Sequence, residues 1–556
     1  MSSSWINEAP QAAMPTRSGL LSKERIVAAP GFNRWLVPPA ALAVHLCIGM
    51  AYGFSVFWLP LSNALGPSVA TCPPEMSLWA ELFTTACDWR IASMGWLYTL
   101  FFLLLGSSAA IWGGWLEHAG PRKAGVIAAL CWCGGLAISA LGVATHQLWM
   151  LWLGSGVIGG IGLGLGYISP VSTLIKWFPD RRGMATGMAI MGFGGGAMIG
   201  SPLAVELMKR FATPDDAGVF ATFLAMAAVY LVFMLGGALG YRIPASGWKP
   251  AGWVPPAPSA NAMITQRHVH VSKVWRIPQF WLVWMVLCMN VSAGIGVIGM
   301  ASPMLQEVFG GDLIGLPKRF GELDQAELTE IALVAASFAA MLSLFNIGGR
   351  FVWASLSDWV GRKRTYTLFL VLGAAMYVSI PFSAAAVEQL PFVAAICVIL
   401  SMYGGGFSTL PAYLADLFGT QMVGAIHGRL LTAWATAGIL GPVTVNYMRE
   451  YQLQLGLPRE QVYNQTMYIL AGMLVVGLVC NLLVRPVADK WFMSDTELAR
   501  EKQLAHERAA AAAVGPGRGS QHRSSRVLLV AAWLAVGLPL AWGIYRTLLS
   551  AIKALV

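Results

Sequence analysis

Long apolar stretches recur along the whole chain and are separated by short polar connections. The hydrocarbon core of a membrane, about 30 Å thick, is crossed by roughly 20 predominantly apolar residues in a helix. Twelve stretches meet this requirement, and a thirteenth follows them. They are centred on residues 37–61, 91–111, 124–141, 148–168, 184–208, 218–241, 280–304, 331–356, 367–386, 392–413, 430–448, 467–484 and 527–549. We therefore predict an all-α membrane protein.

The thirteenth stretch differs from the others because Pro539 and Arg546 interrupt it. A helix with such interruptions can cross the bilayer or lie partly in its interface. We predict that it crosses, as an additional transmembrane helix within residues 526–556.

The composition agrees with a membrane environment. Of the 556 residues, 57% are hydrophobic and only 11% are charged, whereas soluble globular proteins carry about 25% charged residues. The net charge of +10 comes from basic residues scattered over short loops, which do not form the compact basic surface of a nucleic-acid-binding protein. We expect contact with the lipid bilayer and none with nucleic acid.

Lys and Arg gather in the connections after the second, fourth, sixth and eighth stretches, whereas the connection after the seventh is acidic. Short loops rich in Lys and Arg tend to stay in the cytoplasm. This rule places both ends of the twelve-helix core in the cytoplasm, including an N-terminal tail of residues 1–34. We expect a bacterial inner membrane protein with a cytoplasmic N-terminus.

The twelve stretches divide into two halves of six. The halves occupy residues 35–241 and 280–485, and residues 242–279 join them. This connection contains Pro250, Pro255, Pro256 and Pro258 and no acidic residue, as is typical of a flexible linker. Residues 486–525 form a further cytoplasmic segment before the last helix.

One loop pattern occurs in both halves. Its two copies are Gly113, Glu117, Gly120, Arg122 and Lys123 after the second stretch, and Ala354, Asp358, Gly361, Lys363 and Arg364 after the eighth. The glycine permits a tight turn, and the cations can pair with a carboxylate or with the C-terminal end of a neighbouring helix. An ordinary basic loop explains one copy easily, but two copies in register indicate duplication. We predict that both loops act as gates.

This doubled loop, with twelve helices and a long central connection, resembles the major facilitator superfamily. The resemblance covers residues 35–485 and implies two halves that rock around a central site. A narrower resemblance lies in residues 164–187 (GLGYISPVSTLIKWFPDRRGMATG), 411–420 (PAYLADLFGT) and 426–438 (IHGRLLTAWATAG). These segments are similar to the oxalate/formate antiporter family, which implies exchange of small carboxylates.

Arg350 is the clearest candidate for substrate binding. It lies eight residues before Asp358, or about 12 Å inside the membrane boundary. Burying an arginine at such a depth is costly, and no acidic residue in the middle of a span can neutralise it. Its planar guanidinium can hold a carboxylate through two hydrogen bonds. Alternatively, the side chain could extend towards the cytoplasm or bind helix carbonyls.

The resemblance also implies a substrate-binding arginine at this place, together with a lysine on the eleventh helix. In this chain Trp434 stands where that lysine is expected. One fixed positive charge favours a monocarboxylate such as formate, pyruvate or lactate over oxalate.

Several other residues are candidates for the same site. Aromatic walls would exclude water and strengthen the field of the arginine, although each aromatic residue could also be ordinary packing. His45 could carry a proton, or it could be a hydrogen-bonded core histidine, and Lys176 is expected at the membrane interface and not at the substrate. The aromatic candidates are Tyr52, Tyr167, Tyr403, Phe407 and Trp434.

The sequence predicts a monomeric secondary transporter of small carboxylates, working by anion exchange or proton symport. An oxalate/formate antiporter and a carboxylate sensor on a transporter fold are the alternatives. No paired mid-depth carboxylates, metal-spaced His or Cys cluster, or serine nucleophile motif occurs, so we expect no enzyme, metal or cofactor. Cys72 and Cys87 share one outward loop and could form a disulfide or remain reduced.

Overall fold

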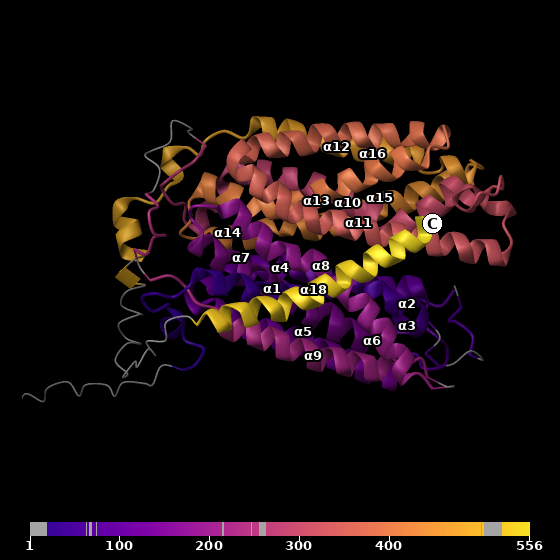
Figure 1. Cartoon of the computed structure of the whole chain (residues 1–556), viewed down its shortest axis with the longest axis horizontal. Helices are drawn as coiled ribbons and strands as arrows, with labels where there is room; N and C mark the ends of the chain where they lie inside the picture. Colours follow the sequence, from indigo (N-terminus) through magenta and orange to yellow (C-terminus); the bar gives the residue numbers. More distant parts are fainter. Residues whose placement is uncertain are drawn as a thin grey trace, which may run out of the picture.

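The computed structural model describes residues 19–62, 64–65, 69–73, 75–213, 216–245, 247–254, 263–501, 503–504 and 525–555. Parts of five predicted segments therefore lie outside the described residues. These parts are 1–18 of the tail, 63, 66–68, 74 and 214–215 of the first half, 246 and 255–262 of the linker, 502 and 505–524 of the segment before the last helix, and 556 of the last helix. Long helices run side by side along the longest axis of the molecule (Figure 1), which confirms the predicted all-α fold.

The first half contains six units in the predicted order. The first unit consists of α1 (Val37–Ile48), the 3-10 helix η3 (Gly49–Phe57) and α2 (Trp58–Leu61). The others are α4 (Ile91–Ala119), α5 (Pro121–Ala144), a unit of α6 (Leu148–Leu151), the π-helix η4 (Trp152–Gly159) and α7 (Gly160–Trp177), then α8 (Arg182–Phe211) and α9 (Val219–Gly240).

The second half repeats this arrangement. Its helices are α10 (Pro278–Phe309), α11 (Gln325–Val360), α12 (Arg362–Ala385), α13 (Gln389–Phe418), α14 (Val423–Leu430) with α15 (Thr432–Gln454), and α16 (Asn464–Leu483). Short helices in the connections are η1 (Lys23–Ile26), η2 (Arg34–Leu36), α3 (Leu78–Phe83), η5 (Val271–Arg276), η6 (Gly310–Ile314), η7 (Phe320–Glu322), η8 (Arg459–Gln461) and η9 (Asp489–Trp491).

Two predicted spans need correction. The stretch 331–356 is the central part of the longer α11, and the stretch 430–448 belongs to a unit that begins earlier, with α14. In the described part of the chain, eleven helices are long and apolar enough to cross a membrane by length and composition, and neither of these two units is among them. Both carry arginines, Arg350 in α11 and Arg449 in α15. They nevertheless run within the bundle (Figure 1).

Glycines allow the first unit to lie directly on α8. A Cβ added to Gly49 would lie 2.2 Å from the carbonyl oxygen of Phe193, and a Cβ added to Gly196 would lie 2.5 Å from Cα of Gly49. Only residues without side chains permit such a close approach of two helix backbones in a membrane. The change from α1 to η3 occurs at this contact.

The two ends of the bundle are distinguished by their connections. A disulfide joins Cys72 and Cys87 between α2 and α4, which selects one of the two states that the sequence left open. We call this end the disulfide face. The opposite end carries the turns at Gly120 and Gly361 and is called the linker face.

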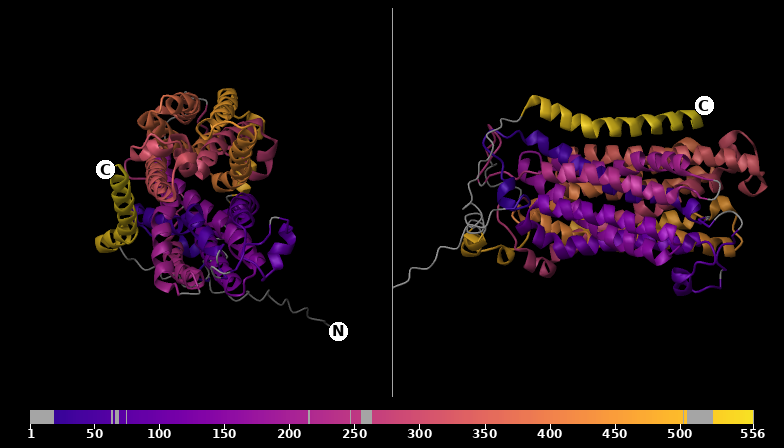
Figure 2. Two further views of the ribbon diagram at one scale, coloured as in Figure 1. Left: turned by 90° about the vertical axis from the view of Figure 1, so that its right-hand side faces the viewer. Right: turned by 90° about the horizontal axis from the view of Figure 1, so that it is seen from below.

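The final helix, α18 (Arg526–Leu555), is continuous through Pro539. It contacts α1 and α8 of the first half and α11 of the second half. Figure 2 shows it on the outside of the bundle, at the side where the two halves meet. Its segment Arg526–Leu549 is one of the eleven candidate spans, as predicted for a thirteenth helix.

Candidate functional site

Arg350 lies in α11 and is completely buried. Its Nε donates a hydrogen bond to Oδ1 of Asn346 (2.8 Å), one helical turn earlier, and its Nη1 donates to the carbonyl of Ile190 in α8 (3.2 Å). Among the described residues, Nη2 has no hydrogen-bond partner and no carboxylate forms an ion pair with this arginine. A buried guanidinium with an available donor is suited to bind an anion.

Glycines in the facing helices make room for this side chain. A Cβ added to Gly194 in α8 would lie 3.0 Å from Nε of Arg350, and a Cβ added to Gly404 in α13 would lie 3.1 Å from its Cγ. Both distances are tight for real side chains. The glycines therefore let a large cation lie between three helices from two different halves.

Three aromatic rings surround the guanidinium. The carbon Cζ of Arg350 lies 5.4 Å from the ring centre of Phe407, 5.8 Å from that of Phe193 and 6.0 Å from that of Tyr52. Ring faces at such distances attract cations. The hydroxyl of Tyr52 hydrogen-bonds to that of Tyr403 across the two halves (3.2 Å). Phe193 was not predicted, and its only sequence signal is that it is the aromatic residue within the glycine-rich stretch 192–196.

Trp434 in α15 is the centre of this aromatic cluster and is fully buried. Its ring centre lies 4.3 Å from that of Phe407 and 5.3 Å from that of Tyr167. Among the described residues, neither Nε1 of Trp434 nor the hydroxyl of Tyr167 has a hydrogen-bond partner. The structure thus brings the predicted substrate-binding residues into one cluster, and their role in binding stays a prediction.

Two histidines lie beside the cluster. His45, in α1, has one ring nitrogen at the carbonyl of Ala189 and the other at the carbonyl of Tyr167. The second, His427, lies in α14 and is buried, although it was not among the predicted site residues. His427 was missed because the predicted eleventh stretch began three residues after it, at 430.

The duplicated loops have the same backbone geometry. Gly120 and Gly361 adopt positive φ angles of 87° and 92°, which favour glycine. Arg122 donates to the carbonyl of Tyr241, just after the end of α9 (3.3 Å), and Lys363 donates to the carbonyl of Val484, just after the end of α16 (2.8 Å). In each half the cation therefore binds the C-terminal end of that half's last helix, where the helix dipole is negative.

The other two predicted gating cations, Lys123 and Arg364, do not join the two halves in the described structure. Lys123 lies over the ring of Trp115 at 5.8 Å, and Arg364 is exposed. The carboxylate of Asp358 does reach the other half, where it accepts a hydrogen bond from the backbone amide of Gly183 at the start of α8 (2.9 Å). A carboxylate at a helix N-terminus is favoured by the available amides and by the dipole.

Residues that the loop pattern did not include complete this contact between the halves. Arg182, at the start of α8, pairs with Asp416 in α13 (3.1 Å). Arg362 bonds to Asp358 and lies 3.5 Å from Asp416. Four charged groups from both halves therefore form one network on the linker face. The sequence contains each of them, but their proximity depends on how α8 packs against α11 and α13.

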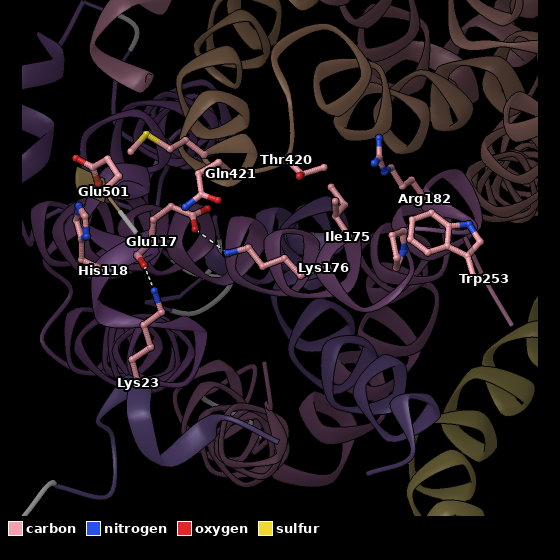
Figure 3. A pocket seen from close by; sticks show the side chains of 12 residues that line it. Lys23, Glu117, His118, Ile175, Lys176, Arg182, Trp253, Thr420, Gln421 and Glu501 are labelled. Carbon is pink, nitrogen blue, oxygen red and sulfur yellow. Dashed lines mark hydrogen bonds and ion pairs between the residues drawn. The ribbon is translucent and has the colours of Figure 1, made fainter. Parts of the chain in front are cut away.

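A second contact on the linker face involves Glu117. Its carboxylate accepts hydrogen bonds from Lys176 (2.7 Å) and Ser172 (3.2 Å), and its carbonyl accepts one from Lys23 (2.5 Å). Lys23, Glu117 and Lys176 border a cavity of about 400 Å³, and Gln421, between α13 and α14, lies next to Glu117 in its wall (Figure 3). Lys176 thus lies at the end of its helix, as predicted, and pairs with the first repeat's acid.

Between Trp434 and the linker face, the two halves are in contact at glycines. A Cβ added to Gly428 would lie 2.3 Å from the carbonyl oxygen of Ala109, and one added to Gly113 would lie 3.1 Å from Cα of Ala425. Helices α4 and α14 are therefore in direct backbone contact. Together with the charged network, this contact separates the buried Arg350 from the linker face in this conformation.

Among protein families, the sequence model of the Major Facilitator Superfamily matches residues 41–442 of this chain. The oxalate:formate antiporter of Oxalobacter formigenes is 23% identical over 410 residues, covering 74% of this chain and 83% of the antiporter. Apicoplast pyruvate carrier 1 of Toxoplasma gondii is 25% identical over 342 residues, covering 53% of this chain and 58% of the carrier. The solved structure of the proton:xylose symporter XylE superposes with a TM-score of 0.57 and 14% identity, covering 84% of this chain and 98% of XylE.

The family match extends over both halves, from α1 to the middle of α15. The likeness to XylE agrees with it in fold. Buried polar groups at the contact between two six-helix halves are also the arrangement found in such carriers. The chain therefore belongs to the Major Facilitator Superfamily and is a membrane transporter.

Proposed function

We propose that this transporter carries small monocarboxylates, by anion exchange or proton symport, with Arg350 as the anion-binding residue. The observation that carries the proposal is the buried guanidinium of Arg350, which has an unpartnered Nη2 and no ion pair among the described residues. An uncompensated charge at this depth is costly. A substrate carboxylate would supply the missing countercharge and accept the available hydrogen bond.

The surroundings of Arg350 support one carboxylate group. The rings of Tyr52, Phe193 and Phe407 face the guanidinium, and the bulky Trp434 occupies the place where the resemblance implies a second cation. The two negative charges of a dicarboxylate such as oxalate would therefore face only one fixed positive charge, in a site of low dielectric constant. A relative named as a pyruvate carrier is consistent with this preference.

Oxalate/formate exchange is the second candidate, because another relative bears that name. Formate would suit both candidates, whereas oxalate would suit only the second. Trp434 is the residue that separates them, since it replaces a charge that a dicarboxylate would need.

In this proposal the linker face is the cytoplasmic face. The basic loops support this orientation, and the disulfide on the opposite face suits an oxidising compartment. The conformation described above is then closed to the cytoplasm, and the contacts around Asp358, Asp416 and Glu117 are the parts that must open. His45 remains a proposed site for a coupled proton.

Proteoliposomes containing the purified protein test the proposal. Uptake of radiolabelled formate, pyruvate, lactate and oxalate is compared between the native protein and Arg350→Lys, with and without a pH gradient. We expect uptake of a monocarboxylate and its loss in Arg350→Lys, because an ammonium group cannot reproduce the planar two-bond geometry. Normal transport by Arg350→Lys would show that the arginine is structural.

A further inference from the structure

His427 is an unusual buried polar residue. Its side chain lies in α14 with 1% of the residue exposed, and neither ring nitrogen has a hydrogen-bond partner among the described residues. Nearly all buried polar groups in folded proteins have a partner. An imidazole without a hydrogen-bond partner in this conformation is suited to bind a proton or an anion for part of the transport cycle.

The position of His427 places it between the proposed substrate site and the linker face. Its ring centre lies 5.9 Å from that of Tyr167, whose hydroxyl also has no partner in the described structure and whose ring contacts Trp434. Gly424 lies one turn before His427 and packs against Glu117. A Cβ added to Gly424 would lie 2.5 Å from Oε1 of Glu117. His427 is therefore followed, towards the linker face, by the first repeat's carboxylate.

The charged and titratable groups around His427 come from several helices. Tyr167 and Lys176 belong to α7, Glu117 to α4 and His45 to α1. Lys176 is bound to Glu117. On its own helix, Arg429 points away, because its guanidinium donates to the carbonyl of Val271 and lies over the ring of Trp275. No carboxylate of the described residues forms an ion pair with His427, so an incoming anion can act as its countercharge.

We propose that His427 takes up the proton that crosses the membrane with the carboxylate, so that transport is an electroneutral symport. This inference rests on the function proposed above. One proton binds one ring nitrogen while the substrate anion occupies the site, and the same proton is released on the side of Glu117 after the linker face opens. One negative and one positive charge cross together, and His427 returns to the neutral state.

The helical spacing supports this role. His427 precedes Trp434 by seven residues, which is two turns of helix, or about 10 Å. The chain lacks a permanent cation at Trp434, and a protonated His427 supplies a temporary one on the same unit. A temporary charge suits symport because it need not be carried back without substrate.

His427 is better placed for this role than His45. The partners of His45 are carbonyls of α7 and α8, and α1, α7 and α8 all belong to the first half. Movement between the halves leaves that environment intact. His427 belongs to the second half and faces Tyr167 of the first, so alternating access changes its surroundings and can change its proton affinity.

The test uses the full chain in proteoliposomes with radiolabelled pyruvate. Net uptake driven by an acidic exterior is measured against exchange with internal unlabelled pyruvate at equal pH. We expect His427→Gln to reduce gradient-driven uptake at least tenfold more than it reduces exchange. His270→Gln, at a histidine just before η5 in the connection between the halves, is the matched control and should leave the ratio of the two rates within twofold of the native value. His45→Gln is measured alongside it. Equal loss of both activities in His427→Gln, or a changed ratio in His45→Gln alone, would overturn the proposal.

A measurement on the native protein covers the case in which the variant does not fold. A pH indicator inside the vesicles should report one proton entering with each pyruvate. Net pyruvate uptake without any proton entry would overturn the role of His427 but leave carboxylate transport intact. If formate, pyruvate and lactate all fail to move in either assay, the proposed function itself fails.

Discussion

The carboxylate of Asp416, near the end of α13, lies 3.1 Å from the guanidinium of Arg182, at the start of α8 in the other half of the molecule. Both side chains are largely shielded, with 13% and 21% of their surface exposed. In the proposed transport cycle this pair joins two halves that separate on the linker face. Its strength therefore influences how often that face opens.

Asp416→Asn should favour opening of the linker face. Loss of the charge leaves Arg182 and Arg362 poorly compensated, which we expect to cost the closed state about 1–3 kcal/mol, or roughly a 5- to 150-fold shift in the equilibrium. A cysteine introduced at the buried Ser408 should then react at least tenfold faster with a soluble maleimide. Asp489→Asn is the control, because its pair with Arg267 is exposed. Unchanged labelling in Asp416→Asn would contradict the gating role.

Trp434→Lys should change the substrate preference. A second cation opposite Arg350 would favour the doubly charged oxalate and leave a monocarboxylate with excess positive charge nearby. We expect oxalate exchange to appear and pyruvate exchange to fall at least tenfold in proteoliposomes. Trp434→Phe should keep the native preference, since it preserves an aromatic ring. An unchanged preference in Trp434→Lys would show that the charge at this position does not select substrate.

Gly404→Ala should impair transport by displacing Arg350. The new methyl group would lie 2.3 Å from the carbonyl oxygen of Asn346 and 3.1 Å from Cγ of Arg350, so α13 and α11 would have to separate. Gly348→Ala is the matched control, because its Cβ would meet open space. We expect at least a tenfold lower uptake rate for Gly404→Ala and near-native uptake for Gly348→Ala. Equal rates would show that this contact adapts easily.

The disulfide between Cys72 and Cys87 should stabilise the disulfide face. For a closed loop with a sequence separation of 15, the chain-entropy model gives about 3 kcal/mol. The double substitution of both cysteines by serine should lower the melting temperature, whereas Cys131→Ser, at an unpaired cysteine, should not. Thiol titration of the denatured, unreduced protein should find six thiols, since the chain has eight cysteines. Eight thiols would disprove the bond.

Glu81 should make the disulfide face sensitive to acid. Burial alone would raise the pKa of its carboxyl, but hydrogen bonds from Arg90 and Ser93 outweigh burial and lower this pKa from its ordinary value of 4.5. A lowered pKa means that the stabilisation is fully present above pH 4.5 and is lost as the pH falls through the lowered value. The difference in melting temperature between native protein and Glu81→Gln should therefore shrink below that pH. A constant difference would contradict this assignment.

The sequence predicted the helices well because membrane thickness sets a minimum apolar length that few other structures share. It predicted Arg350 because a lone charge in such a helix is conspicuous. The contacts that define the site could not be predicted in this way. The carbonyl of Ile190 and the ring of Phe193 reach Arg350 only because α8 crosses α11 at glycines, a packing detail that involves residues far apart in the chain.

The eleventh stretch was predicted to begin too late, at 430, because its true start also depends on contacts between distant residues. The unit starts at Val423 and changes from α14 to α15 around Leu431, next to the close contact of Gly428 with α4. Periodicity within one segment contains no information on such a contact. His427 therefore fell outside the predicted stretch 430–448, although it lies in the buried part of the unit.

The last helix, α18, touches α1 and α8 on one side and α11 on the other. The indole of Trp533 donates to the carbonyl of Trp35 (3.1 Å), and Gly543 lies against Ile199, so the described attachments favour the first half. If the halves rock, one helix cannot follow both, and the boundary between α18 and α11 must slide. The first half would then carry α18 with it as one body. Resistance at the boundary between α18 and α11, and the lipid around it, would influence the speed of each cycle.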